Sequence, residues 1–213
     1  YALKTLKPSV KIYGVQAAGA PSMFNAVQTG KAETLYSVST FADGIAVKCP
    51  GVNTFEYCKK YVDEVITVSE DEISAAILHL IENQKLTAEG AGAVSIAAVK
   101  FGKVPVEGKK VVCLVSGGNI DVTILSRVID RGLHKSGRAC SIVIELIDKP
   151  GQLEAVSRII ARCGGNVVSV HHEHGDAQAV NGCFLRIGRE TKSFEHIEEI
   201  RSALVAEGFK LVQ

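Results

Sequence analysis

The chain has 213 residues, of which 46% are hydrophobic and 22% are charged. That length allows one large domain or two small ones, and it supplies enough apolar side chains to bury a core. The 24 basic and 23 acidic residues leave a formal charge of +1, which argues against a strongly basic nucleic-acid-binding protein. No apolar run approaches the roughly 20 residues that span a bilayer, so no membrane partner is expected.

The chain begins Tyr-Ala-Leu-Lys, with neither an initiating Met nor the pattern of a signal peptide, and this beginning predicts an interior fragment of a longer chain. The cysteines are scattered, without the C-x-x-C pairs of zinc ribbons or thioredoxin-like motifs. Such cysteines are typical of small buried side chains in a reducing compartment, so we expect a cytoplasmic protein. The six are Cys49, Cys58, Cys113, Cys140, Cys163 and Cys183.

The first block, residues 1–138, alternates apolar β-branched runs with segments of helical period. Ser69 and Glu72 have the spacing of a capping box, which predicts that a helix begins after Ser69. Gly90–Phe101 is almost wholly apolar and predicts a buried helix. Near-continuous apolar strands separated by helices predict an α/β fold with a mostly parallel sheet. The predicted strands are Val10–Gln16, Glu64–Ser69 and Lys110–Ser116.

His134–Arg138 is a short polar stretch with one glycine, which indicates a linker. Residues 139–213 then predict the order strand, helix, strand, strand, helix, strand, which is the βαββαβ order of the ferredoxin-like motif. We therefore expect two domains, 1–138 and 139–213. The predicted elements are Cys140–Asp148, Leu153–Cys163, Asn166–His174, Gly182–Arg189, Phe194–Glu207 and Phe209–Val212.

The motif Val115–Asp121, Val-Ser-Gly-Gly-Asn-Ile-Asp, directly follows a predicted strand and precedes a helical segment. Ligands of parallel sheets bind at the carboxyl ends of strands, so Ser116 is expected at the edge of a site. Gly117 and Gly118 allow the backbone to approach a ligand closely. A plain strand-to-helix turn would explain the same residues without a ligand.

Four segments give that motif a context: Thr40–Val47, Asp63–Glu72, Ala88–Ala93 and Leu114–Asn119. In this order and at these separations they resemble the second half of threonine dehydratases, pyridoxal-phosphate lyases related to serine dehydratase and serine racemase. The resemblance covers nearly all of the first block. It implies part of a tryptophan-synthase-beta-like (fold type II) domain that eliminates water from threonine to give 2-oxobutanoate and ammonia.

The resemblance also assigns roles to residues. Ser116 matches the residue that hydrogen-bonds the pyridine nitrogen of pyridoxal 5'-phosphate, and a neutral hydroxyl there makes the ring a weaker electron sink than a carboxylate would. Loss of a β-hydroxyl after α-deprotonation needs only such modest stabilisation. Glu89 matches a carboxylate close to the cofactor, although by pattern alone a helix cap is equally suitable. The cofactor-binding residues implied are Ser116, Gly117, Gly118, Asn119, Gly44 (beside Asp43) and Glu89.

Relatives carry a Schiff-base lysine and a glycine-rich phosphate loop that precede the part seen here, and no lysine of this chain matches that motif. Lys4, Lys7 and Lys11 are expected to be solvated, and Tyr1–Leu6 to be the end of the helix after the phosphate loop. No catalytic residue is therefore assigned. We expect the chain alone neither to hold the cofactor covalently nor to turn over threonine.

Relatives such as serine racemase bind a divalent cation through acidic residues after the first strand. The matching positions here are Gln16, Ala20 and Ser22, which include no carboxylate. Magnesium and calcium need several hard oxygens, charged ones among them, so no such site is expected here. A monovalent ion held by backbone carbonyls remains open.

In the second block, Ile147–Leu153 and Cys163–Val168 carry a D-x-P-G-x-L turn and a G-x-N entry to a strand. The pair resembles the ACT domain, whose paired copies bind small amino acids at their interface. Amides at the helix start suit a carboxylate, and the Asn166 side-chain oxygen suits an ammonium group. A plain helix start and turn would explain the same residues. The effector residues implied are Pro150, Gly151, Gln152, Leu153 and Asn166.

A run of histidines lies in one predicted strand of that block. His172 and His174 would share one face, and His171 and Glu173 the other. Two imidazoles make an incomplete zinc site, so the pattern favours a solvated or subunit-facing strand and no metal.

These observations together predict the C-terminal part of a threonine dehydratase with a regulatory ACT domain. Unpaired edge strands of a single βαββαβ sheet favour at least a dimer. The expected ligands are a small amino-acid substrate and an amino-acid effector, with isoleucine or valine as effector candidates. The alternatives are an amino-acid-sensing or dimerisation module without catalysis, and a serine dehydratase or racemase.

Overall fold

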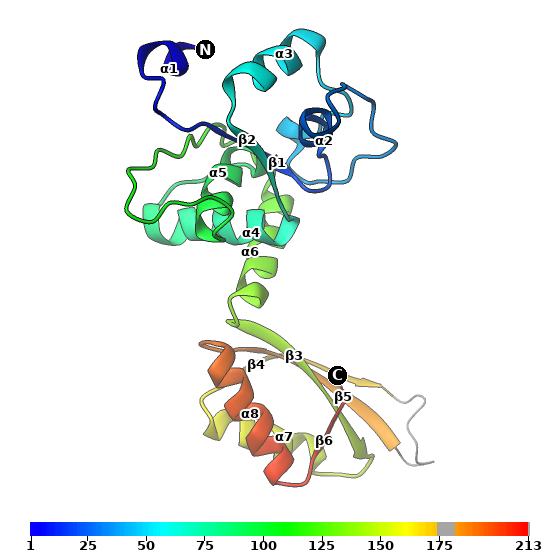
Figure 1. Ribbon diagram of the computed structural model, residues 1–213. Helices are drawn as coiled ribbons and strands as arrows, with labels where there is room; N and C mark the ends of the chain where they lie inside the picture. Colours follow the sequence, from blue (N-terminus) through cyan, green and yellow to red (C-terminus); the bar gives the residue numbers. More distant parts are fainter. Residues whose placement is uncertain (174–181, 213) are drawn as a thin grey trace. The chain divides into compact units, whose positions relative to one another are not determined.

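The computed structural model describes residues 1–173 and 182–212, which form two compact units, Tyr1–Gly132 and Leu133–Gln213. The boundary lies within helix α6 (Val122–Lys135), a few residues before the polar stretch that suggested a linker. Both units combine helices with strands, so the expected α/β class is confirmed (Figure 1).

The first unit contains a two-stranded parallel sheet of β1 (Tyr13–Ala17) and β2 (Glu64–Val68). Both strands lie within or next to the predicted apolar runs, and they pair in register, with Tyr13 opposite Glu64. The helices of this unit are α1 (Ala2–Leu6), α2 (Ser22–Thr29), the 3₁₀ turn η1 (Asp43–Ile45), α3 (Val52–Tyr61), α4 (Glu70–His79), the π turn η2 (Leu80–Gln84), α5 (Gly90–Lys100) and α6.

Helix α4 begins with the predicted capping box. The Ser69 hydroxyl accepts a hydrogen bond from the Glu72 N–H (3.2 Å), and the Glu72 carboxylate accepts one from the Ser69 N–H (2.8 Å). Helices α4 and α5 pack against each other, and α5 also contacts both strands (Figure 1). Their buried faces form the core of the unit, which includes Val68, Ile73, Ala76, Ile77, Leu80, Ala93, Val94 and Ala97.

Lys110–Ser116 is not a strand, so that part of the prediction is wrong. Within the described residues no strand pairs with this segment, and Val112 and Leu114 are 94% and 77% exposed. One contact that holds it is the Ser95 hydroxyl, which donates to the Leu114 carbonyl (2.9 Å). An apolar run becomes a strand only where a neighbour takes its backbone hydrogen bonds, and β1 and β2 take each other's.

Lys4 is not solvated, contrary to expectation. Its side chain is 18% exposed, and its Nζ lies 2.6 Å from Oδ2 of Asp63. Lys11 Nζ lies 3.1 Å from Oδ1 of the same carboxylate, and the Ile12 N–H donates to it at 2.8 Å. These contacts lower the pKa of Asp63 well below its usual range, with the Lys4 hydrogen bond as the largest cause. The two lysines therefore link the segment before β1 to Asp63, the residue that precedes β2.

The second unit has the predicted βαββαβ order. Its elements are β3 (Ala139–Ile147), α7 (Gln152–Arg162), β4 (Asn166–Glu173), β5 (Gly182–Glu190), α8 (Phe194–Ala206) and β6 (Lys210–Val212). The sheet order is β4-β5-β3-β6 and all neighbours are antiparallel. Alternate residues of β3 and β5 pack with α7 and α8, which cover one face of the sheet (Figure 1). This core contains Ile142, Ile144, Val156, Ile160, Leu185, Ile187, Ile200 and Leu204.

The opposite face of that sheet carries charged and polar side chains beside apolar ones such as Val143 and Phe184. His171 lies opposite Arg186 and Glu173 opposite Phe184, whereas His172 lies opposite Leu185 on the helix-covered side. The predicted split of these side chains between two faces is therefore confirmed for β4, and His174 lies outside the described residues.

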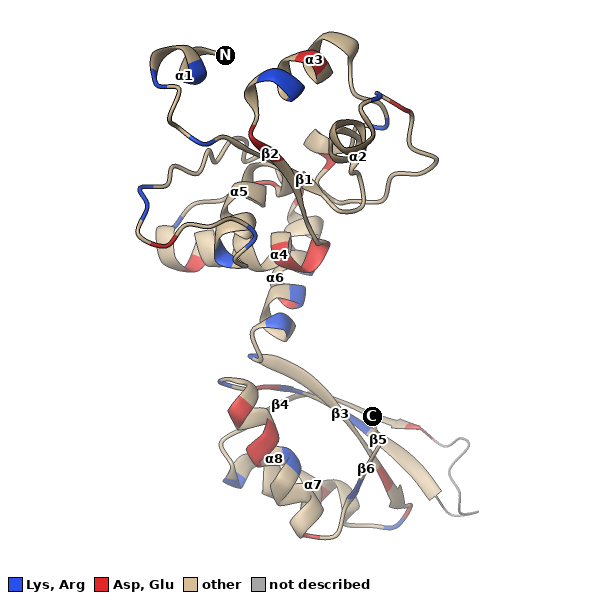
Figure 2. Cartoon of the chain, viewed as in Figure 1, with Lys and Arg blue, Asp and Glu red and all other residues tan. Residues whose placement is uncertain are grey.

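Basic and acidic residues are interspersed in both units, in keeping with the net charge of +1 (Figure 2). Across residues 1–173 and 182–212, none of the helices combines the length and the hydropathy of a membrane span.

Candidate functional site

Three segments that are distant in the sequence meet around Glu89. The Oε2 atom of Glu89 accepts a hydrogen bond from the Asn119 N–H (3.2 Å), and the Glu89 N–H donates to the Gly117 carbonyl (3.2 Å). A Cβ placed on Gly44 would lie 3.2 Å from Oε1 of Glu89. The structure therefore brings together the predicted loop Ser116–Asn119, Glu89 and Gly44.

Glu89 has the backbone position of a helix cap but not the side-chain role of one. It is the N-cap residue of α5, with φ −74° and ψ 169°, and its carboxylate makes no capping hydrogen bond. The carboxylate is turned to the Ser116–Asn119 loop instead. The carboxylate therefore does not cap α5, and the place of Glu89 beside a cofactor stays a prediction.

The glycines of this loop are required by the packing of the protein itself. Gly117 has φ +83°, and a Cβ on it would lie 2.6 Å from Cδ of Glu89. A Cβ on Gly118 would lie 2.9 Å from the Thr87 carbonyl oxygen. Real Cβ atoms do not approach heavy atoms so closely, so both positions admit only glycine without a shift of the loop.

Two further glycines belong to the site, and our sequence reasoning gave them no role. A Cβ on Gly92 would lie 2.2 Å from the Ser116 carbonyl oxygen, and a Cβ on Gly90 would lie 2.8 Å from Cα of Ala42. The first turn of α5 thus packs closely against the Ser116 loop and against the residue that precedes η1. The sequence signal was the Gly-Ala-Gly spacing at the start of an apolar helix, where Gly lowers helix propensity and needs a packing reason.

Ser116 presents a free hydroxyl at this meeting point. The residue is exposed, and within the described residues its side chain has no hydrogen-bond partner. The far end of its loop is anchored by Asp121, whose carboxylate accepts the Thr123 hydroxyl, the Thr123 N–H (2.8 Å) and the Ile124 N–H (3.3 Å). These hydrogen bonds, with the Thr123 hydroxyl first, lower the pKa of Asp121. A charged cap at the start of α6 therefore fixes the end of the loop at Asp121.

Glu70 contacts the segment that precedes η1. It was assigned no role from the sequence. Its Oε2 accepts a hydrogen bond from the Phe41 N–H (3.0 Å), and its Oε1 is buried with no partner among the described residues. A Cβ on Gly19 would lie 1.8 Å from the Ser39 carbonyl, so the chain before η1 also packs on the loop after β1.

At the positions matched to a divalent-cation site in relatives, the Gln16 side chain makes a hydrogen bond within the protein. Gln16 Oε1 accepts a hydrogen bond from the Phe24 N–H (2.8 Å) in the first turn of α2, and both Ala20 and Ser22 are buried. Gln16 thus satisfies an unpaired amide of a helix start. The expectation of no magnesium or calcium there stays a prediction.

The predicted effector residues lie in the second unit but do not lie together. Gly151 is the N-cap residue of α7, with φ +90°, and no side chain caps this helix. The register places Ile147 opposite Gly182 but Asn166 opposite Glu190, at the other end of β5. At about 3.3 Å per strand residue, Ile147, the last residue of β3 before the Gly151 turn, therefore lies roughly 25 Å from the level of Asn166 along the sheet.

Asn166 is also engaged within its own sheet. Its Nδ2 donates to Oε2 of Glu190 (2.9 Å), which leaves its side-chain oxygen for another donor. A single ligand that touches the α7 amides and Asn166 would therefore need two copies of the chain.

The first unit fits one side of pyridoxal 5'-phosphate. The Ser116 hydroxyl, which is exposed and has no hydrogen-bond partner among the described residues, suits the ring nitrogen. These features suit the cofactor ring, whereas the chain has no glycine-rich loop of the kind that holds its phosphate.

The comparisons with known proteins agree with this fit. The family model described as "Pyridoxal-phosphate dependent enzyme" matches residues 1–117. The chain is 46% identical over 211 residues to an L-threonine ammonia-lyase of Thermotoga maritima, an alignment that covers 99% of this chain and 52% of that protein. The chain thus spans about half the length of the curated relatives it matches.

The solved structures that are similar to the chain include a threonine deaminase and a serine racemase. A processed threonine deaminase isoform of Solanum lycopersicum has a TM-score of 0.56 at 35% identity, covering 61% of this chain and 36% of its own. A maize serine racemase has a TM-score of 0.54 at 31% identity, and the match covers 61% of this chain and 42% of the racemase chain. By the family match over more than half of its residues, the chain belongs to the pyridoxal-phosphate-dependent enzymes.

Proposed function

We propose that the chain is the C-terminal part of a threonine ammonia-lyase, which eliminates water from threonine to give 2-oxobutanoate and ammonia. The observation that carries this proposal is the convergence of Gly44, Glu89 and the Ser116–Asn119 loop at one place in the first unit. The 46% identity to an L-threonine ammonia-lyase along almost the whole chain supports the choice of reaction.

The residues of the chain would have distinct tasks in that reaction. When bound, the cofactor supplies an electron sink for the charge left by α-deprotonation. Ser116 would hydrogen-bond the ring nitrogen through a neutral hydroxyl, which keeps the sink modest. Glu89 would hold the loop that carries Ser116 at a fixed distance from α5. Gly117 and Gly118 would let the loop pack against Glu89 and Thr87 and so fix the position of Ser116.

The test uses the protein encoded by the complete source gene. The proposal predicts an upstream lysine and a glycine-rich phosphate loop, and formation of 2-oxobutanoate from threonine by the purified product. Ser116→Ala should lower kcat with little change of KM for threonine, because it removes a contact to the cofactor and not to the substrate. A gene that lacks the upstream lysine, or a product inactive on threonine, would refute the proposal.

A serine racemase or dehydratase is the second candidate, and the maize serine racemase similarity favours it. The two candidates differ in their products, because racemisation yields D-serine whereas elimination from serine yields pyruvate. Measurement of both products with L-serine, beside 2-oxobutanoate with L-threonine, separates them.

We further propose that the βαββαβ unit is a ferredoxin-like ACT domain that binds an amino-acid effector between paired copies. The open N-terminus of α7 supports a carboxylate subsite at Pro150–Leu153. The distance from Gly151 to Asn166 within one chain supports a site completed by Asn166 of a second copy. The protein would then be a cytoplasmic homo-oligomer whose effector changes the pairing. A dimerisation unit without a ligand is the alternative.

A further inference from the structure

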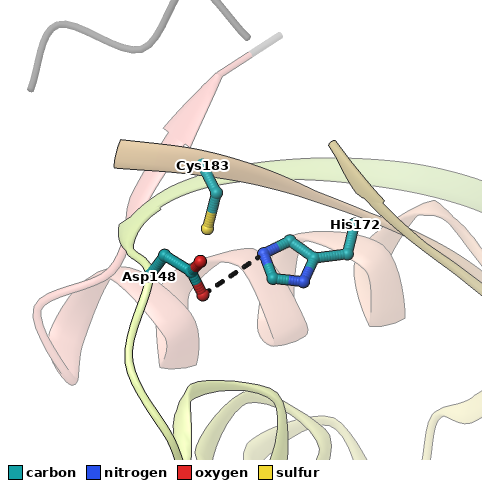
Figure 3. Close-up of side chains that lie close together, drawn as sticks. All are labelled: Asp148, His172 and Cys183. Carbon is teal, nitrogen blue, oxygen red and sulfur yellow. Dashed lines mark ion pairs between the residues drawn. The ribbon is translucent and has the colours of Figure 1, made fainter. Parts of the chain in front are cut away.

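Three side chains of different chemistry come together in the second unit, and no step of the proposed reaction uses them. They are Asp148, His172 and Cys183, and their ligand atoms all lie within 4.8 Å of one another (Figure 3). Asp148 Oδ1 and His172 Nε2 are 3.6 Å apart. Figure 3 shows the sulfur and the imidazole turned toward the same carboxylate.

The sheet topology places these residues next to one another. Cys183 lies on β5 opposite Leu146 of β3, and Asp148 follows that strand. His172 lies on β4 opposite Leu185 of β5. Leu185 follows Cys183 by two residues, so His172 and Cys183 lie on the same face of the sheet. The three donors therefore come from three adjacent backbone segments, whose spacing the strand hydrogen bonds determine.

The donor set is one that transition metals prefer. Zinc binds thiolate, imidazole and carboxylate at about 2.3, 2.0 and 2.1 Å, which in a tetrahedron separates ligand atoms by roughly 3.3–3.6 Å. The Asp148–His172 distance already has that value, and the sulfur, which lies within 4.8 Å of both ligand atoms, needs to approach by at most about 1.3 Å. We propose that Asp148, His172 and Cys183 are three ligands of a binding site for a divalent transition metal such as Zn²⁺.

Burial and exposure at the cluster fit a metal that enters from solvent. Cys183 is fully buried, whereas the side chains of Asp148 and His172 are 42% and 44% exposed. Desolvation, followed by the charge of Asp148, raises the pKa of Cys183, so the thiol keeps its proton when no cation is present. A bound Zn²⁺ would take the place of this proton and remove the repulsion between thiolate and carboxylate.

The experiment is a Zn²⁺ titration of the metal-stripped 213-residue chain in competition with a chromophoric chelator, repeated with Co²⁺ as an optical probe. The expected result is one tight equivalent of Zn²⁺ and a thiolate-to-cobalt charge-transfer band in the near ultraviolet. His172→Gln and Asp148→Asn should each weaken Zn²⁺ binding by more than about 100-fold, beyond the roughly 10- to 100-fold that loss of a supporting contact produces. Both residues are exposed, so these variants carry the test even if Cys183→Ala fails to fold.

The matched controls are His171→Gln and Cys140→Ala. His171 neighbours His172 but points to the other face, and Cys140 lies at the opposite end of β3. Both variants should bind Zn²⁺ as the unmodified chain does. Absence of a stoichiometric equivalent, a Co²⁺ spectrum without the thiolate band, or equal losses in His171→Gln and His172→Gln would overturn the proposal.

Discussion

Oε2 of Glu89 accepts a hydrogen bond from the backbone N–H of Asn119 across 3.2 Å, and this contact joins two segments 30 residues apart. It connects the start of α5 to the loop that presents Ser116. A carboxylate in this place therefore has a structural task whether or not a cofactor is bound.

Glu89→Ala should loosen the Ser116–Asn119 loop. The change removes the acceptor of the Asn119 N–H, and the chain should lose about 1 kcal/mol of unfolding free energy. Glu89→Gln keeps an acceptor oxygen and should lose less. Hydrogen exchange at the Asn119 amide and urea unfolding measure the two effects, with exposed Glu33→Ala as the control. Unchanged exchange at Asn119 in Glu89→Ala would contradict the role of this contact.

Gly117→Ala should cost more stability than Gly108→Ala, although both glycines have positive φ. A Cβ meets Glu89 at 2.6 Å in the first case and open space in the second. Gly108→Ala should cost about 1 kcal/mol for the backbone alone, and Gly117→Ala about 2–4 kcal/mol because of the added clash. The cost of Gly117→Ala should fall in a Glu89→Ala background. A double-mutant cycle with urea unfolding would show independence if the clash were absent.

The Asp63 carboxylate should contribute stability that depends on pH. Its pKa is lowered in the folded chain, so its contribution is complete above the unfolded pKa of about 3.9 and is lost as the pH falls toward the folded pKa. The stability difference between the unmodified chain and Asp63→Asn should be constant from about pH 5 to 7 and shrink below about pH 4. Urea unfolding across this range measures it. A difference that grows as the pH falls would have the wrong sign.

Arg189→Met should stabilise the second unit. Arg189 is 2% exposed, and its Nε and both Nη atoms have no hydrogen-bond partner among the described residues, so burial lowers its pKa. A desolvated, unpaired cation is unfavourable, and a thioether of similar length should gain about 1–3 kcal/mol. Arg186→Met, on the other face of β5, is the matched control and should change little. Thermal unfolding that finds Arg189→Met destabilised would refute this expectation.

Amino-acid binding should require both ends of the βαββαβ sheet. Calorimetry of the chain with isoleucine, valine, threonine and serine should show heat for at least one ligand, with affinity that falls when dilution separates the copies. Gly151→Asp should abolish binding because it adds negative charge beside the α7 amides. Asn166→Ala should weaken binding by about 1–2 kcal/mol for one charge-assisted hydrogen bond.

The control for Gly151→Asp is Gly208→Asp, since both glycines have positive φ and open space around the missing Cβ. The control variant should bind as the unmodified chain does. No heat with any of the four amino acids at millimolar concentration would leave the unit as a dimerisation device.

Local patterns in the sequence determined much of the fold. The Ser69–Glu72 capping box, the apolar helix α5 and the six elements of the second unit lie where they were expected, because caps, helical period and strand alternation act within a few residues. The motif around Ser116 likewise identified the loop that the structure places against Glu89.

Relations between distant segments were decided by the tertiary structure. Lys110–Ser116 has the composition of a strand but no neighbouring strand among the described residues, and composition does not supply a hydrogen-bonding partner. Strand register separated Gly151 from Asn166, and the same register brought Cys183 beside Asp148 and His172. Register depends on which residues of two strands face each other across the core, and a single strand's sequence does not contain that information.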